Sequence, residues 1–198
     1  MIAKATRNLS DATYPSINYE AIWPELEGFA ANVFSQFGED GLIARTFELI
    51  GTTNKQCFEF GAADGVFCSN TRALCENGWR GVWIEPNKTL YTMLRCRKPL
   101  TVGARMTAIT PENVDRILKA SGLPAQPDLG VIDVDGSELA IWQAMIEVQP
   151  RVMLIEHFDE DGGEHLQETI EVGRSLRYRP LAVTFCNTLL GKDDLFDD

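Results

Sequence analysis

The sequence is poor in basic residues. Its 198 residues contain 18 lysines and arginines against 29 aspartates and glutamates, which gives a formal net charge of −11. Binding to nucleic acid depends on clustered lysine and arginine side chains that neutralise phosphates. The composition therefore argues against a nucleic-acid partner and favours a neutral or cationic partner, such as a small molecule or a glycan.

Long apolar runs are also missing. None approaches the roughly 20 residues of a membrane span, and the opening MIAKATRNLS lacks the apolar core of a signal peptide. The five cysteines are an odd number without metal-type pairing, which is typical of reduced thiols. These features predict a cytoplasmic protein with no membrane partner and no disulfide, and they leave the oligomeric state open.

The length suits a single α/β domain. We expect residues 1–33 to form an N-terminal arm with a short helix from Ile22 to Phe29, and residues 34–198 to form the ligand-binding core. Apolar runs alternate with helical segments from Cys57 onward. This alternation predicts a Rossmann-like α/β sandwich with a mostly parallel central sheet, helices on both faces and an antiparallel last strand. Strands are expected near 57–60, 81–85, 102–108, 129–134, 152–155, 181–185 and 188–190, and helices near 39–50, 70–76, 88–96, 110–120, 137–145 and 164–176.

The stretch from Cys57 to Asn87 has the order of a nucleotide-binding βαβ unit. An apolar run leads into the glycine turn Gly61-Ala62-Ala63-Asp64-Gly65, a helical segment follows, and a second apolar run ends in Glu85. In such units the acid that ends the second strand binds the ribose hydroxyls. Glu85 lies 20 residues after Gly65, where that acid is expected.

The same turn indicates which nucleotide is bound. A dinucleotide needs two further glycines, but Ala63 and Val66 occupy those places, and Asp64 adds a negative charge where a pyrophosphate would lie. S-adenosylmethionine (SAM) has no phosphate, and Glu59 and Asp64 would attract its ammonium and sulfonium. The turn therefore favours SAM over NAD. The alternative without a ligand is a plain strand-turn-helix with incidental acids.

Four sequence blocks carry a resemblance to a known family: SQFGEDG from Ser35, EFGAADG from Glu59, GWRGVWIE from Gly78 and IDVDGSE from Ile132. Through them the chain resembles the FkbM-type SAM-dependent methyltransferases, a class I family, from about Phe34 to Phe196. It departs from them at Val131, where many relatives have lysine, and in a shorter segment after the fifth strand. The turn and the resemblance together predict these cofactor-binding residues: Gln36, Asp40, Glu59, Gly61, Ala62, Asp64, Gly65, Asn70, Glu85, Pro86 and Asp133.

Acids also follow the later strands. Asp133 lies at the end of the fourth strand, where it would face the methionine end of SAM and hold the ammonium or the incoming hydroxyl. Glu156 and His157 end the fifth strand, and a histidine there is a candidate general base. We therefore predict catalytic roles for Asp133, Glu156 and His157, while His157 could instead be structural. Ser137 is expected to cap a helix that runs through Met145, and Asp135 could serve the site or this helix start.

The same acids allow a metal site. Asp133, Asp135 and Glu156 could supply oxygens to magnesium. We favour a site without metal, because the DVDG pattern lacks the further acids of a calcium loop and the sequence has no histidine-cysteine cluster for zinc. Asn187 matches a cleft-facing asparagine in the resemblance, or is a turn residue between two strands.

These patterns converge on one expected function. It is SAM-dependent O-methylation of a hydroxyl on a sugar, a glycan or a secondary metabolite, with the enzyme aligning the acceptor, methyl group and sulfur and removing the acceptor proton. Two alternatives remain: a SAM-fold binding module without transferase activity, and an NAD-linked oxidoreductase. The short segment after Glu156 keeps the binding module open, because it leaves little chain to cover an acceptor.

Overall fold

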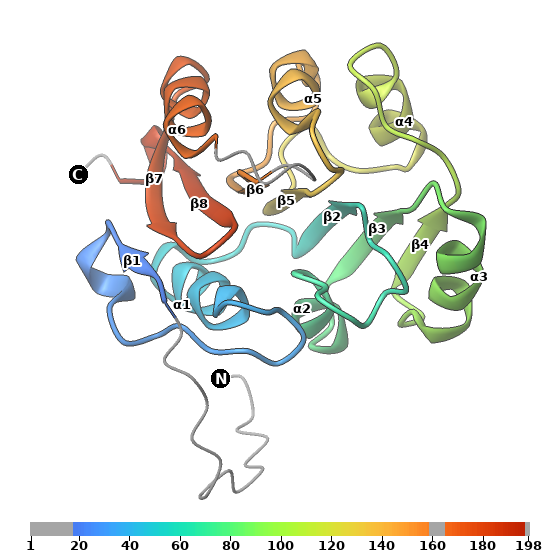
Figure 1. The fold of residues 1–198 in the computed structure, drawn as a ribbon, viewed down its shortest axis with the longest axis horizontal. Helices are drawn as coiled ribbons and strands as arrows, with labels where there is room; N and C mark the ends of the chain where they lie inside the picture. The colour runs from blue at the N-terminus through green and yellow to red at the C-terminus, as the bar shows by residue number, and fades with distance from the viewer. Residues whose placement is uncertain (1–17, 159–164, 197–198) are drawn as a thin grey trace, which may run out of the picture.

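The computed structural model describes residues 18–158 and 165–196. They form an eight-stranded sheet with helices on both faces, shown in Figure 1. The strand order is β1-β7-β8-β6-β5-β2-β3-β4. Residues 1–17 of the predicted N-terminal arm lie outside the described residues, as do residues 159–164, which include the first residue of the helix predicted near 164–176.

Five neighbouring strands are parallel. They are β4 (Val102–Arg105), β3 (Arg80–Ile84), β2 (Gln56–Phe60), β5 (Leu129–Ile132) and β6 (Val152–Glu156). Most of their residues are buried, as expected for parallel strands that are covered on both faces. The chain proceeds outward from β2 to β3 and β4, then returns to β5 on the other side of β2. This reversal opens a crevice at the carboxyl ends of β2 and β5, which is where ligands bind in such sheets.

The remaining strands form an antiparallel end. The last strand, β8 (Asn187–Lys192), pairs antiparallel with β6, and β7 (Tyr178–Val183) pairs antiparallel with β8. A two-residue strand, β1 (Glu20–Ala21), pairs antiparallel with β7 at the edge. The predicted fold class, including the antiparallel last strand, is therefore confirmed.

Helices cover both faces of the sheet. Figure 1 shows α1 (Glu39–Ile50), α2 (Arg72–Glu76) and α3 (Lys88–Arg97) on one side, and α4 (Val114–Ala120), α5 (Glu138–Ala144) and α6 (Leu166–Ser175) on the other. Each layer buries its own apolar cluster, one that includes Leu42 and Trp83 and another that includes Phe58, Phe60 and Ile141. No helix within the described residues is long and apolar enough to cross a bilayer.

Two expected helix starts are wrong. The segment from Ile22 to Phe29 forms only the 3-10 helix η1 (Pro24–Leu26), because the N–H groups of Ile22 and Trp23 bond instead to the carbonyl of Leu181 on β7. The fourth helix begins at Val114 rather than at Thr110. There Asn113 accepts a hydrogen bond from the N–H of Thr110 and closes a turn before the helix.

Candidate active site

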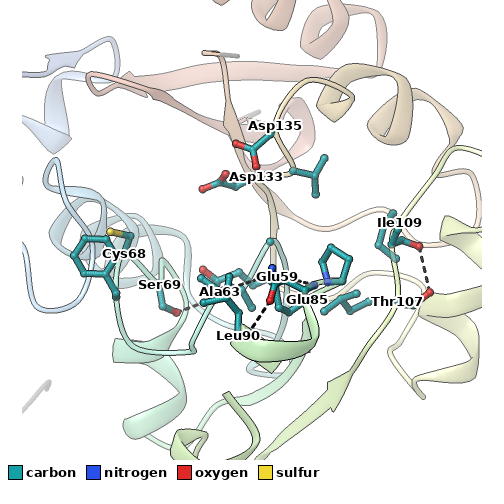
Figure 2. A pocket seen from close by; sticks show the side chains of 18 of the residues that line it. Glu59, Ala63, Cys68, Ser69, Glu85, Leu90, Thr107, Ile109, Asp133 and Asp135 are labelled. Carbon is teal, nitrogen blue, oxygen red and sulfur yellow. Dashed lines mark hydrogen bonds between the residues drawn. The ribbon is translucent and has the colours of Figure 1, made fainter. Parts of the chain in front are cut away.

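A cavity of about 510 Å³ lies at the carboxyl ends of the parallel strands (Figure 2). It occupies the crevice made by the reversal of strand order between β2 and β5. Seven of the predicted cofactor-binding residues line it: Gln36, Glu59, Gly61, Ala62, Glu85, Pro86 and Asp133. The other four predicted residues, Asp40, Asp64, Gly65 and Asn70, are not among its lining.

Gly61 allows two strand ends to meet at the floor of this cavity. Its φ is +72°, and a Cβ atom at this position would lie 1.6 Å from the carbonyl oxygen of Asp133. Its N–H also donates to the carbonyl of Ile84, at 3.0 Å, so this residue bonds to the end of β3 and packs against the residue after β5. A side chain here would push Asp133 away from the cavity. Gly65 is also tightly packed, but against the ring of Trp83 rather than against the cavity.

The Glu85 carboxylate is fixed by backbone groups. Its Oε2 accepts a hydrogen bond from the N–H of Ala63, at 2.9 Å, and its Oε1 accepts one from the N–H of Asn87, at 2.7 Å. Because each carboxylate oxygen can accept two hydrogen bonds, both keep a free lone pair. Figure 2 shows Glu85 beside Ala63 and Leu90 in the cavity wall. The carboxylate is therefore held ready to accept two hydroxyl hydrogens from a ligand.

Glu59 is buried and largely occupied by the protein itself. Its carboxylate accepts hydrogen bonds from the Ser69 hydroxyl at 2.8 Å, the Thr71 hydroxyl at 2.6 Å and the N–H of Asn70 at 2.8 Å. Burial raises the pKa of Glu59 to about 7, although these hydrogen bonds oppose the rise. Glu59 thus anchors the segment before α2 to the end of β2. Asn70 contributes its backbone N–H to this anchor.

Asp64 holds the glycine turn together. Its Oδ1 accepts hydrogen bonds from the N–H groups of Val66 and Phe67, both at 2.9 Å, and its Oδ2 pairs with Arg97. Partial burial would raise the pKa of this carboxyl, but the two N–H groups and the Arg97 charge hold it below its usual value. The negative charge of Asp64 is therefore largely compensated within the protein.

Asp40 plays a similar part before α1. Its Oδ2 accepts hydrogen bonds from three successive N–H groups, those of Val33, Phe34 and Ser35, at 2.7 to 2.8 Å. The loop closed in this way carries Gln36, which lines the cavity and whose amide Nε2 contacts the Cys68 sulfur. Asp40 therefore positions a cavity residue from outside the cavity.

Three carboxyl groups meet above the cavity. An oxygen atom from each of Asp133, Asp135 and Glu156 lies within 4.8 Å of the others, and Figure 2 shows Asp133 and Asp135 facing the side where Glu59 and Glu85 lie. Burial, followed by the charge of Asp133, raises the pKa of Glu156 to about 9. Burial also raises the pKa of Asp133, to about 6, although a hydrogen bond with Glu156 opposes this rise. The two raised pKa values indicate that the pair keeps one proton near neutral pH.

This arrangement could also hold a divalent cation. Three carboxylates at this spacing offer the oxygen ligands that magnesium takes. The Oε2 of Glu156 is buried, and no described donor reaches it. A proton on this oxygen, shared with Asp133, would explain why no donor is needed there. A bound cation would explain it equally well.

A second cavity, of about 360 Å³, lies between the starts of α5 and α6 and the end of β6. Glu156 and His157 line this cavity and not the first, while Ser137 lines both. The His157 ring is buried, and its Nδ1 lies 3.0 Å from the hydroxyl of Thr188 on β8. The predicted catalytic residues are therefore divided, with Asp133 in the first cavity and Glu156 and His157 in the second.

The start of α5 differs from the expected cap. Glu138, not Ser137, satisfies the backbone there, because its carboxylate accepts hydrogen bonds from the N–H groups of Val134 and Gly136. Asp135 adopts a φ of +63° and lines the first cavity. Its side chain therefore belongs to the site rather than to the cap.

Asn187 is the first residue of β8 and not a turn residue. It pairs with Glu156 in the sheet, and its amide Nδ2 donates to Oε1 of the buried Glu39, at 3.0 Å. Its Oδ1 is buried without a described hydrogen-bond partner. Asn187 thus links the end of β6 to the start of α1 beside the carboxyl group of Glu156.

Several lining residues escaped the sequence analysis. Thr107, Ala108 and Ile109 line the cavity, and Figure 2 shows Thr107 and Ile109 on its right and Cys68 on its left. Leu90 of α3 also lines it. The sequence could have predicted the residues after the third strand as part of the site, because residues that follow a parallel strand lie at the ligand-binding edge of the sheet. That strand, β4, ends at Arg105. The expected strand extended to Ala108 and therefore placed Thr107 and Ala108 within the sheet rather than at its edge.

Comparisons with known proteins identify the fold. No family model and no curated protein sequence matches the chain. Among solved structures, an O-methyltransferase from Bacillus cereus in complex with SAH matches with a TM-score of 0.57 at 15% identity, over 82% of this chain and 83% of that one. A candidate O-methyltransferase from Klebsiella pneumoniae matches at 0.56 and 13%, over 84% of each chain.

A third structure agrees with these two. A TehB-like SAM-dependent methyltransferase from Corynebacterium glutamicum matches with a TM-score of 0.51 at 12% identity, over 76% of this chain and 86% of that one. The chain therefore has the Rossmann-like fold of class I SAM-dependent methyltransferases. At these identities the likeness shows the fold alone, and the function depends on the residues of the site.

Proposed function

We propose that this protein is a SAM-dependent methyltransferase that methylates a hydroxyl of a sugar, a glycan or a secondary metabolite. The observation that carries the proposal is the cavity itself. Glu85 at the end of β3 presents two free lone pairs, and the Asp133 carboxyl lines the same cavity from the end of β5. Glu85 would bind the ribose of SAM at one end of this cavity, and Asp133 would attract its positively charged part at the other end. The shared fold supports this assignment.

The residues present fit SAM. Glu85 would accept the two ribose hydroxyls, Gly61 and Ala62 would let backbone approach the ligand, and the apolar Leu90 and Ile109 would contact the adenine. No lysine or arginine is among the described lining residues, which suits a ligand that has no phosphate and carries positive charge. SAM supplies a methyl group bound to a positively charged sulfur.

Asp133 has two tasks in this proposal. As a carboxylate it attracts the positive charge of the methyl donor, and it accepts the proton of the acceptor hydroxyl as the oxygen attacks the methyl carbon. Glu156, which holds the shared proton near neutral pH, donates to Asp133 and fixes its orientation. Most of the acceleration comes from holding donor and acceptor in line.

The O-methyl specificity rests on the resemblance to the FkbM-type family and on this carboxylate base. The main alternative is a binding module that holds SAM without transferring the methyl group. An NAD-linked oxidoreductase is disfavoured, because Ala63 and Val66 replace two glycines that a dinucleotide needs.

Isothermal titration calorimetry with SAM, SAH and NAD tests the ligand. We expect SAM and SAH to bind and NAD not to bind. In the variant Glu85→Gln, which keeps the side-chain size, we expect SAM affinity to fall by about 1.5 to 3 kcal/mol, as for the loss of charged hydrogen bonds. Micromolar NAD binding without a response to SAM or SAH would refute the assignment. An unchanged affinity in a folded Glu85→Gln variant would remove Glu85 from the ribose site.

A further inference from the structure

We infer that the second cavity, between α5 and α6, is the binding site of the methyl acceptor, and that it takes an uncharged sugar ring. This inference rests on the proposed function, because it assigns the first cavity to SAM. The site is defined here by these lining residues: Glu156 at the end of β6, Phe158 after it, Ala140 and Gln143 of α5, and His165 and Glu168 at the start of α6.

The two cavities meet at the reacting carboxyl groups. Asp133 lines the first cavity, Glu156 lines the second, and oxygen atoms of the two residues lie within 4.8 Å of each other. Ser137 lines both cavities. A hydroxyl that enters from the second cavity would therefore come within reach of the same carboxyl groups that border the first cavity, where the methyl donor is assigned. Holding the acceptor oxygen and the donor close together in this way is what methyl transfer requires.

The charges of the second cavity restrict the acceptor. Glu138 and Glu168 are among its lining residues, and the described lining contains no lysine or arginine. Phosphate and carboxylate groups are bound by arginine and lysine, and they would be repelled by these acids. Carboxylates and imidazoles do accept hydrogen bonds from sugar hydroxyls. An acceptor that carries phosphate or carboxylate near its reacting hydroxyl is therefore disfavoured.

A row of aromatic rings continues from the cavity rim. Phe158 lines the cavity and stacks on Phe185, with ring centroids 5.3 Å apart and planes at 12°. Phe185 in turn contacts Phe37, at 5.0 Å, which follows the first-cavity residue Gln36 in the chain. Phe185 is 55% exposed although its ring is apolar. Three segments distant in sequence thus bring phenyl rings into a row that begins at the second cavity.

This combination suits a sugar ring. The C–H groups on one face of a pyranose can pack on the electron-rich face of a phenyl ring, while its hydroxyls need acceptors nearby. The reaction then balances: the acceptor oxygen forms a bond to the methyl carbon, the carbon–sulfur bond breaks, and its electron pair stays on sulfur. The acceptor proton passes to the carboxyl pair and then to solvent.

The decisive variant is Ala140→Trp, which fills the second cavity from an exposed position on α5 and leaves the first cavity unchanged. Ala120→Trp is the matched control, because Ala120 is also exposed near a helix end and lines neither cavity. Each protein is assayed with radiolabelled SAM and a panel of neutral methyl glycosides and their phosphorylated counterparts. Ligand-observed NMR with SAH present measures acceptor binding without turnover.

We expect neutral glycosides to bind and to be methylated with a kcat/KM at least tenfold above that of their phosphates. Ala140→Trp should lose acceptor binding and transfer while SAH affinity stays within about twofold, and Ala120→Trp should match the parent. Phe185→Ala should raise the acceptor KM about fivefold with kcat little changed, as expected for one lost stacking contact.

The outcomes separate this inference from the proposed function. Normal transfer by a folded Ala140→Trp protein, or equal use of phosphorylated glycosides, would overturn the acceptor site while leaving the methyltransferase intact. Binding of SAM with neither binding nor methylation of any neutral glycoside would overturn the acceptor class. Absence of SAM and SAH binding in the parent would instead reject the proposed function.

Discussion

The carboxyl pair of Asp133 and Glu156 should make the folding stability depend on pH in a specific direction. The pKa values in the folded protein are raised, to about 6 and about 9 respectively, whereas these side chains titrate near about 3.9 and 4.3 in unfolded chains. The folded protein therefore binds these protons more tightly than the unfolded chain does. The resulting stabilisation is complete below about pH 4 and is lost as the pH rises toward 9.

The size of this loss follows from the Glu156 shift. At about 1.36 kcal/mol per pKa unit, a rise from 4.5 to about 9 would correspond to about 6 kcal/mol for a group shielded from solvent. Glu156 is only partly buried, so solvent screening reduces this value. We expect an effect of about 2 kcal/mol on the free energy of unfolding between pH 5 and pH 9.

The variant Glu156→Gln tests this expectation. It keeps the size of the side chain and a hydrogen-bond donor toward Asp133, and it removes the titrating group. Urea unfolding at pH 5, 7 and 9 gives the free energy of unfolding. We expect the difference between variant and parent to grow with pH, until the variant is more stable than the parent by about 2 kcal/mol at pH 9.

Glu27→Gln is the control, because Glu27 is exposed and lies in the loop after η1, outside both cavities. Its stability curve should stay parallel to that of the parent. If the curve of Glu156→Gln also runs parallel to the parent, the two carboxyl groups do not share a proton in the folded protein, and the assignment of Asp133 as a base held by Glu156 loses its support.

Three further predictions concern the same region. Asp133→Asn should lower turnover about a hundredfold or more while SAM affinity changes much less, as for a lost general base; equal turnover in a labelled-SAM assay would remove Asp133 from the chemistry. Gly61→Ala should unfold the protein or abolish SAM binding, because its Cβ would overlap the Asp133 carbonyl. Gly122→Ala is the control, at a φ of +74° with no atom within 4 Å of the added Cβ, and thermal unfolding should show a loss of only about 1 to 2 kcal/mol in the free energy of unfolding. Methyl transfer should persist in EDTA; a loss that magnesium restores would assign a cation to the three carboxyl groups.

The strands and their functional ends could be predicted from the sequence. Parallel strands buried on both faces leave continuous apolar runs, and the residue that ends such a run is a candidate for the ligand edge. Glu85, Asp133 and Asp135 follow β3 and β5 in this way and line the cavity. The glycine turn placed Gly61 and Ala62 there for the same reason.

The hydrogen-bond partners of individual acids could not be predicted. An acid beside a glycine turn can face a ligand or accept hydrogen bonds from the loop's own N–H groups, and the sequence pattern is the same in both cases. The carboxylates of Asp64 and Asp40 accept hydrogen bonds from N–H groups of their own loops. The Glu85 carboxylate also accepts hydrogen bonds from backbone N–H groups, but it lines the cavity and has lone pairs left for a ligand. His157 is paired with Thr188 because β8 folds back beside β6, which local periodicity does not encode.

The edge of the sheet at β7 is covered by the N-terminal part of the chain, and this affects where the chain can be shortened. The two residues of β1 pair with β7, and the N–H groups of Ile22 and Trp23 donate to the carbonyl of Leu181 on β7. An uncovered strand edge is a template for pairing with another molecule. Deletion through Leu26 would uncover β7 and create such a template next to the hairpin that carries Phe185 and Asn187. The short N-terminal strand thus covers the edge of β7, although neither of its residues lines either cavity.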